Sequence, residues 1–238
     1  MRVTSTEVQN NFGRYLNLAA ASEEVIITKN GRDMAKIVKC HGESTVNEEL
    51  AFYESENGTR ITYEEFLQMT EKSDLRYEFI DGEVFAIATP GYAHQAAISA
   101  INGRFYNWFR GKKCRSLTSP FEVVLVKESG GKNVVQPDIV VICDSGNIDG
   151  KGKYKGIPSL VVEVLSSSSK KHDMLRKLFL YAQTGIKEYW IVDTYIKAVY
   201  LYCLENEDDL DITVFKNEES VRSVIFKGLE IPLDEIFE

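Results

Sequence analysis

Two acidic residues stand inside apolar stretches of this sequence. Asp138 follows a proline in QPDIVVI, and Glu163 lies in the middle of LVVEVLS. A carboxylate that is removed from water is costly unless it is paired or bound to a metal. If the two stretches are neighbouring strands, both acids can meet at one sheet edge and offer the oxygen ligands that Mg²⁺ prefers. Either acid could instead cap a turn or pair with a lysine.

A divalent ion held by two carboxylates can activate water and stabilise the charge of a phosphodiester under attack. This pair of acids is therefore a candidate Mg²⁺ or Mn²⁺ site. We expect no organic cofactor, because the glycines form no phosphate-cradling loop of a common type. A serine-hydrolase triad has no support, since the chain has only 3 histidines and no GxSxG phrase.

The spacing of apolar residues predicts the elements that must position these acids. GYAHQAAISAINGRFYNWFRGKK repeats apolar residues at helical spacing, and the strand candidates FEVVLVK, VVQPDIVVIC and SLVVEVLS follow it. The last two are almost continuously apolar, as strands of a central sheet are. A second helix begins after four serines, with an apolar stripe at Leu175, Leu178, Phe179 and Ala182, and the strand EYWIVD comes next.

Further elements are expected on both sides of this region. Thr62 and Glu65 have the spacing of a capping box, which predicts a helix to about Thr70. LRYEFIDGEVFAIA predicts a hairpin that turns at Asp81 and Gly82. The tail adds AVYLYCLE, DITVFK and SVIFK as antiparallel strands. The expected fold class is therefore α/β, of the α+β kind.

The order helix, three strands, helix, strand, with PD and then E, resembles the PD-(D/E)xK nuclease superfamily. The phrases YEFIDGEV, VVQPDIVVICD, GIPSLVVEVLSSSS, KHDMLRKLFLYAQTGIKEYWIVD and GLEIPLDEIF resemble its Uma-type restriction endonuclease branch across residues 60–238. The resemblance implies a restriction-endonuclease-like central mixed sheet flanked by helices. It also implies a DNA-cleaving enzyme in which Asp138 and Glu163 are catalytic and hold the metal.

The lysine of this superfamily normally stands two residues after the second acid, and here that position is Leu165. The resemblance to the Uma-type branch places the lysine on the following helix, where it matches Lys177. It implies that Lys177 orients or activates water and steadies the phosphate. Asp173 and Tyr181 stand four residues before and after it and share its helix face, so both are candidate supporting residues.

Other assignments remain open around this site. The face of Lys177 lies opposite the apolar stripe, so an exposed Asp–Lys pair is the plain alternative, and Lys170 and Lys171 are rival lysines. The DGE phrase of the branch makes Glu83 a candidate supplementary metal ligand, although hairpins often carry an exposed Glu. His94 on the long helix is a candidate ligand, as helix histidines are in some members of the superfamily, or a structural histidine.

The first forty residues have the pattern of a small separate module. MRVTS predicts a strand, and VIIT and MAKIVK predict a hairpin around KNGRD. The helix expected between them has Thr6 as its N-cap, with Phe12, Leu16 and Ala19 or Ala20 along one face. These phrases resemble the N-terminal module of the Phd/YefM antitoxins, which implies a DNA-binding homodimer. So small a module has little core, and we expect it to dimerise.

The composition bounds the domain organisation and the partners. We expect an antitoxin-like module at residues 1–48, a linker at 49–60 and the nuclease domain at 61–238. Hydrophobic residues make up 44% of the 238, and no apolar run reaches the roughly 18 residues of a membrane span. We therefore expect a cytoplasmic protein with no membrane partner. The 4 cysteines form no CxxC pair and are expected to be reduced and structural.

The net charge of −8 is unevenly distributed. Residues 60–200 carry 19 Lys and Arg against 16 Asp and Glu, whereas residues 201–238 carry 3 against 11. A local phosphate-facing surface is thus compatible with the acidic total, although such basic runs are often solvated faces. The basic clusters are Arg104, Arg110, Lys112, Lys113 and Arg115, then Lys151, Lys153 and Lys155, then Lys170, Lys171, Arg176 and Lys177.

The sequence therefore leads to one preferred function and two alternatives. The preferred one is a metal-dependent DNA endonuclease fused to an antitoxin-like module and acting as a homodimer. A non-catalytic DNA-binding regulator is the first alternative. A toxin–antitoxin fusion whose nuclease is restrained by its own N-terminus is the second.

Overall fold

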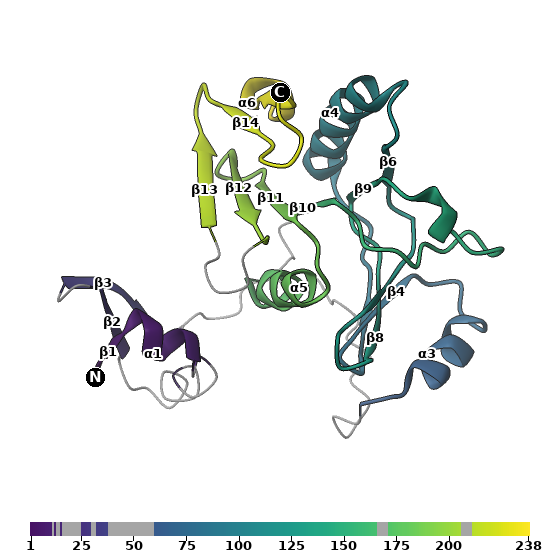
Figure 1. Ribbon diagram of the computed structural model, residues 1–238, viewed down its shortest axis with the longest axis horizontal. Helices are drawn as coiled ribbons and strands as arrows, with labels where there is room; N and C mark the ends of the chain where they lie inside the picture. Colours follow the sequence, from purple (N-terminus) through teal and green to yellow (C-terminus); the bar gives the residue numbers. More distant parts are fainter. Residues whose placement is uncertain are drawn as a thin grey trace. The chain divides into compact units, whose positions relative to one another are not determined.

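A computed structural model describes residues 1–10, 12, 15, 25–29, 32–37, 60–165, 171–205 and 211–238 (Figure 1). The chain divides into two compact units, residues 1–47 and residues 48–238. Each unit is described by itself. Within the described ranges, no helix is long and apolar enough to cross a membrane.

The first unit is built from three strands and a helix. β1 (Arg2–Thr4) runs parallel to β2 (Val25–Lys29), which pairs antiparallel with β3 (Arg32–Ile37). Val3, Val8, Tyr15 and Val25 form its buried core, with Phe12 packed against them. Leu16, Ala19 and Ala20 lie outside the described residues.

The helix of this unit begins earlier than the sequence predicts. α1 spans Ser5–Asn10, so Thr6 lies inside it and the expectation of Thr6 as N-cap is wrong. The backbone N–H of Glu7 donates to Thr4 Oγ1 at 3.2 Å, and Glu7 Oε2 accepts from the backbone N–H of Thr4 at 2.8 Å. This reciprocal pair is a capping box, in which the acid three residues on completes the cap.

The second unit is organised around a six-stranded mixed sheet, as expected for the α+β class. Its strands, in spatial order, are β13 (Asp211–Lys216), β12 (Ala198–Cys203), β11 (Glu188–Asp193), β10 (Leu160–Leu165), β9 (Ile139–Ile142) and β6 (Arg115–Thr118). The β10–β11 pair is parallel, and the other neighbours are antiparallel. The parallel pair is joined through a helix, the usual crossover between parallel neighbours.

A four-stranded antiparallel sheet stands beside it. Its strands, in spatial order, are β5 (Glu83–Ala86), β4 (Tyr77–Ile80), β8 (Lys132–Val135) and β7 (Val123–Val126). Asp81 and Gly82 have φ of 52° and 85° in the β4–β5 turn, the left-handed conformation of the hairpin that the sequence predicts. The capping box of Thr62 and Glu65 is also present, at the start of α3 (Tyr63–Thr70).

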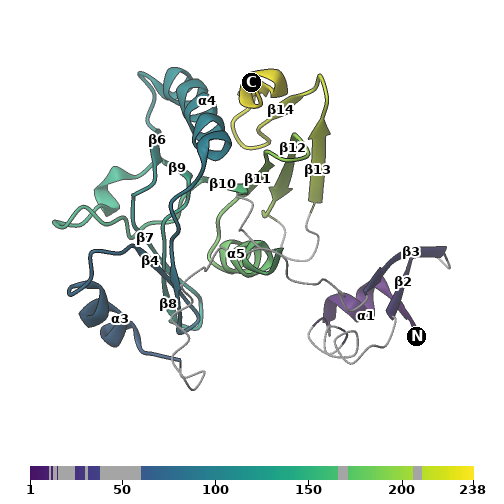
Figure 2. The ribbon, with the colours of Figure 1, turned by 180° about the vertical axis from the view of Figure 1, so that it is seen from behind.

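The two large helices pack on different hydrophobic clusters of this unit. α4 (Tyr92–Phe109) contributes Ile101 and Phe105 to the cluster that contains Val162 and Trp190 of the six-stranded sheet. α5 (Lys171–Gln183) contributes Leu178 and Tyr181 to the other, in which both sheets take part. In Figures 1 and 2, α4 lies toward one end of the unit with α6 (Leu233–Ile236), away from α5. Alternate residues of β10 therefore face different helices.

Two strand predictions are wrong in detail. VVQPDIVVIC is not one strand, because it divides into β8 and β9, which belong to different sheets. Pro137 stands between them and has no backbone N–H to give to a ladder. SVIFK is not a strand either; β14 (Ser220–Arg222) comes just before it and pairs with β15 (Glu230–Pro232).

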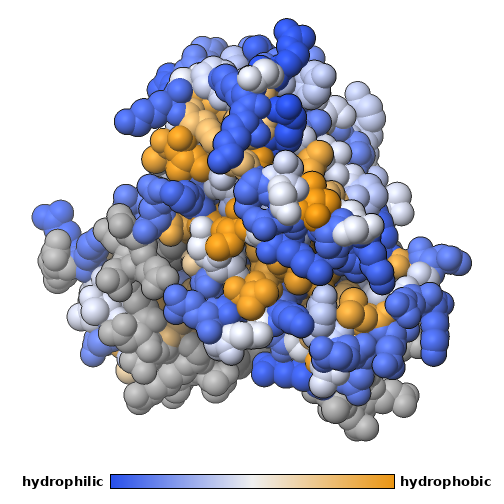
Figure 3. All heavy atoms as spheres, turned by 45° about the vertical axis from the view of Figure 1, so that its right-hand side comes forward, coloured by the Kyte–Doolittle hydropathy of each residue, from blue (hydrophilic) through white to orange (hydrophobic). Residues whose placement is uncertain are grey.

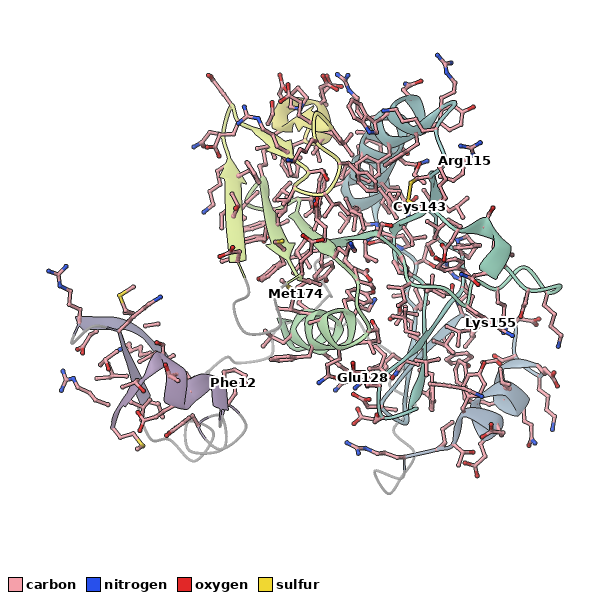
Figure 4. All side chains as sticks on the ribbon, viewed as in Figure 1. Phe12, Arg115, Glu128, Cys143, Lys155 and Met174 are labelled. Carbon is pink, nitrogen blue, oxygen red and sulfur yellow. A yellow bond between two sulfur atoms is a disulfide. The ribbon has the colours of Figure 1, made fainter. Side chains whose placement is uncertain are left out.

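The expectation that all four cysteines are reduced is wrong for one pair. Cys114 and Cys143 form a disulfide, drawn in yellow beside the Cys143 label in Figure 4. Cys114 precedes β6 and Cys143 follows β9, and the register of these strands places Arg115 opposite Ile142. The two cysteines are therefore the next pair along the same ladder. Sequence spacing gives no sign of this, since 29 residues separate them.

Candidate active site

The sheet register brings Asp138 and Glu163 together. β9 and β10 are antiparallel with Ile139 opposite Val162, so the next positions outward are Asp138 and Glu163. The backbone N–H of Val164 donates to Asp138 Oδ2 at 2.7 Å. The side chains of Asp138 and Glu163 remain 17% and 13% exposed, which leaves each a path to solvent.

Glu163 faces α5, and two side chains of that helix contact it. Val161 belongs to the cluster packed on α5, so Glu163, two residues on, points to the same side of β10. Lys177 Nζ lies 3.0 Å from Glu163 Oε1, and the Tyr181 hydroxyl donates to the same oxygen at 2.7 Å. The i, i+4 spacing of Lys177 and Tyr181 aims both at one acid.

Lys177 is buried although it lies off the stripe of apolar residues in its helix. It is 7% exposed, whereas the stripe residues Leu175 and Phe179 are 41% and 46% exposed. The stripe predicted for the buried face of α5 is therefore wrong at these two positions. Exposed hydrophobic residues are not confined to α5: on the face of the protein drawn in Figure 3, they form several separate patches. Lys177 turns inward, so it is not the exposed lysine of the alternative Asp–Lys pair.

A third acid, Glu78, joins this cluster and was missed in the sequence. Lys177 Nζ donates to Glu78 Oε1 at 2.9 Å, and the backbone N–H of Gln136 donates to the same oxygen at 2.9 Å. Glu78 is 5% exposed and belongs to β4, where every residue is buried. The signal that singled out Glu163, an acid between apolar strand residues, is also present in YEFI. It could have found Glu78.

His94 also contacts Asp138. Its Nε2 atom is 3.2 Å from Asp138 Oδ2, and the residue is 9% exposed. Its Nδ1 atom is buried and has no hydrogen-bond partner among the described residues. The side chain thus stands beside a candidate metal ligand, where it can hold the Asp138 carboxylate in place.

The other candidate residues do not reach the cluster or cannot be placed. Glu83 is paired with Arg176 at 3.3 Å, and its side chain is 45% exposed. The side chains of Asp173 and Lys171, and the whole of Lys170, lie outside the described residues.

Several of the basic residues considered for phosphate contacts are engaged within the unit. Arg104 is paired with Glu235, Lys153 with Glu122, and Lys155 with Asp149 at 3.0 Å. Lys112 lies over the ring of Trp108. These side chains can still reach a phosphate, but their partners offset part of their charge.

Comparisons with known proteins show the family and the fold of the chain. Residues 63–234 match the family Uma2, described as "putative restriction endonuclease". The chain belongs to this family. Residues 1–41 match the antitoxin Phd_YefM family of type II toxin–antitoxin systems. Both resemblances noted in the sequence are thus confirmed, and membership of the Uma2 family supports a nuclease.

Two individual proteins resemble the Uma2 part of the chain. An uncharacterised protein of Synechocystis is 27% identical over 180 residues, which cover 75% of this chain and 92% of that protein. A crystal structure described as a "putative nuclease belonging to DUF820", from Anabaena variabilis, has a TM-score of 0.62 at 19% identity. It covers 74% of this chain and 97% of its own. The structural likeness confirms the restriction-endonuclease-like fold.

Burial dominates the electrostatics of the Uma2 site. The pKa of Glu163 is raised to about 8, mainly by burial; Lys177 lowers this pKa, and the nearby Asp138 and Glu78 raise it. Burial also raises the pKa of Tyr181, followed by the charge of Glu163. Tyr181 therefore remains a hydroxyl that can donate to Glu163. The cluster holds more negative charge than Lys177 alone can balance.

The donor set of the Uma2 site fits a divalent cation. Within the described ranges, Asp138 Oδ1 and Glu163 Oε2 accept no hydrogen bond, so each carboxylate keeps one oxygen for a ligand. No group of three or more His, Cys, Asp and Glu is arranged to hold a metal among these residues. An ion would thus take two protein oxygens and complete its shell with water, as Mg²⁺ commonly does.

The metal-free Uma2 protein is expected to lose stability as pH rises. Because the folded pKa of Glu163, about 8, exceeds the ordinary 4.5, its contribution is complete at low pH and is lost through about pH 8. In EDTA, the unfolding free energy of wild type should therefore fall between roughly pH 5 and pH 9. That of Glu163→Gln should fall less over the same range, and the two decreases should differ by at most a few kcal/mol. Urea unfolding at several pH values measures this. The exposed Glu230→Gln is the control; equal slopes for all three proteins would contradict the assignment.

Proposed function

We propose that this chain is a metal-dependent DNA endonuclease whose reacting groups are Asp138, Glu163 and Lys177. The observation that carries the proposal is the contact of Lys177 with Glu163 at 3.0 Å. The position two residues after Glu163, where the superfamily normally has its lysine, is Leu165. Lys177 of α5 supplies a lysine beside Glu163 instead. Acid, acid and lysine are the groups that phosphodiester hydrolysis requires, because that reaction depends mainly on positioning and charge.

Each residue of the cluster has a distinct task in this proposal. Asp138 and Glu163 would hold Mg²⁺ or Mn²⁺, which when bound supplies positive charge against the phosphate and makes water more acidic. Lys177 donates to a phosphate oxygen or to the attacking water. Glu78 and Tyr181 act as positioning residues, since one holds the Lys177 ammonium and the other holds the Glu163 carboxylate. Pre-set geometry of this kind avoids reorganisation during the reaction.

The antitoxin-like unit provides the second part of the proposal. Its match to the Phd/YefM family favours DNA binding by residues 1–41, and the buried core among its described residues is small. We propose that it forms the dimer contact of a homodimer, because two nuclease sites are needed to cut both strands of a duplex. The same match favours the regulator as the second candidate function.

Plasmid cleavage tests the proposal. Supercoiled DNA incubated with the full chain should be nicked or linearised with Mg²⁺ or Mn²⁺ and left intact in EDTA. The chain beginning at residue 48 should be compared in the same assay. Faster cleavage without the first unit would support the self-restrained fusion. No cleavage by either form, with salt-dependent DNA binding preserved, would overturn the endonuclease in favour of the regulator.

A further inference from the structure

A groove of about 940 Å³ lies beside the acidic cluster, next to residues that neighbour its acids. His94, which lies 3.2 Å from Asp138, forms part of its wall. Leu165 forms another part and stands two residues after Glu163 on the same face of β10. A substrate strand whose scissile phosphate lies at Asp138 and Glu163 can therefore place an adjoining nucleotide at this groove.

Among the described residues, the floor of the groove is apolar and carries little charge. Leu178 of α5, Ile191 of β11 and two tyrosines of β12, Tyr200 and Tyr202, line it. Met174, labelled beside α5 in Figure 4, lies against the same space. Asp193 is the charged side chain of the described lining, and its Oδ1 accepts from the backbone N–H groups of Tyr195 and Ile196 at 3.0 and 3.1 Å. Such a surface suits a flat aromatic group better than a phosphate.

Two exposed tyrosines border this floor. Tyr92, the first residue of α4, is 86% exposed, and Tyr195, in the turn after β11, is 95% exposed. The turn that carries Tyr195 is held by Asp193, and Tyr92 is held by the helix. Single exposed aromatics are ordinary, but these two stand on one groove beside one candidate active site. Exposed rings on an ordered backbone are the stacking platforms that single-stranded nucleic acids use.

We propose that this groove binds an unpaired nucleobase next to the scissile phosphate, stacked on Tyr92 or Tyr195. The inference rests on the proposed nuclease function and narrows its substrate to single-stranded DNA or duplex with locally opened bases. In an intact duplex the bases are stacked inside the helix and cannot enter an apolar groove. The volume lies in the range of pockets that enclose small organic molecules, so a nucleoside has room.

Binding of fluorescent oligonucleotides to the full-length protein in EDTA tests this inference. The probes are a single strand, a blunt duplex of the same sequence, and the single strand with abasic sites. Tyr92→Ala or Tyr195→Ala, whichever tyrosine carries the stacked base, should weaken single-strand binding by about 5- to 150-fold, the range for one lost base stack. Neither should change duplex or abasic binding by more than about 2-fold. Tyr92→Phe and Tyr195→Phe should retain wild-type affinity, because the ring remains.

The matched control is Tyr106→Ala, another exposed tyrosine of α4 that does not line the groove. If Tyr92→Ala and Tyr195→Ala bind the single strand as Tyr106→Ala does, the groove proposal is overturned. Equal losses for single strand and duplex would also overturn it. If wild type cuts plasmid DNA while the tyrosine variants bind the single strand as the control does, only the groove proposal fails. If wild type neither binds nor cuts any DNA, the nuclease proposal fails as well.

Discussion

Replacing Lys177 with methionine is expected to lower the rate of DNA cleavage by about 10²- to 10³-fold while metal binding is retained. The ammonium group of Lys177 is held between Glu78 and Glu163, at 2.9 and 3.0 Å. It is thus positioned before substrate arrives. Methionine has a similar length and no charge, so the main loss is the donor at the phosphate. Single-turnover cleavage of a labelled plasmid, with saturating Mn²⁺, measures the effect.

The stability of this variant must be measured alongside its activity. Removing the lysine leaves two carboxylates in a buried site, and breaking a buried pair can cost about 3–5 kcal/mol. A shift of the melting temperature on adding Mn²⁺ shows that the variant is folded and still binds the ion. Lys187→Met is the control, since Lys187 forms an exposed pair with Glu205. A folded Lys177→Met protein that cleaves as fast as Lys187→Met would exclude Lys177 from the reaction.

Replacing Asp138 with asparagine is expected to abolish both metal binding and cleavage. One of the two protein oxygens available to the ion loses its charge, and Mg²⁺ binds neutral amide oxygens more weakly than carboxylates. We expect a fall in cleavage of at least about 10³-fold at Mg²⁺ concentrations that saturate wild type. Isothermal titration with Mn²⁺ should show no binding where wild type does, and high Mn²⁺ should restore little activity.

The folded state should tolerate this change, which separates the role of Asp138 from a structural one. Asparagine can still accept the backbone N–H of Val164 through its amide oxygen. Removing one acid also relieves the repulsion that raises the pKa of Glu163. The melting temperature in EDTA should therefore equal or exceed that of wild type. Asp144→Asn serves as a control in β9's flanking loop, although it weakens a contact to Tyr154. An Asp138→Asn protein with unaltered cleavage would refute the metal role.

The cluster of buried acids lowers the stability of the metal-free protein. Glu78 and Glu163 both contact Lys177, Asp138 lies close to Glu163, and burial raises the pKa of Glu163. Hydrophobic packing could fill the space at lower cost. Retention of unfavourable charge in a cluster that reaches solvent is typical of functional sites. The same cluster explains why ion binding should stabilise the folded chain.

The local elements of this protein follow from its sequence alone. Capping residues such as Thr62 start helices through contacts within one turn, and the Asp81–Gly82 pair adopts a hairpin conformation that few other residues reach. The acids in QPDIVVI and LVVEVLS could also be recognised, because an acid in an apolar strand is conspicuous. All these features depend on neighbours within a few positions of the chain.

Other features depend on which elements meet, and only the tertiary structure decides that. Lys177 is buried because α5 faces two sheets at once, so an acid from β4 and one from β10 receive it on a side that helical periodicity marks as polar. Glu78 joins the site for the same reason. The disulfide between Cys114 and Cys143 depends on the pairing of β6 with β9. Contacts between distant segments are set by the packing of the whole unit, and no local pattern encodes their partners.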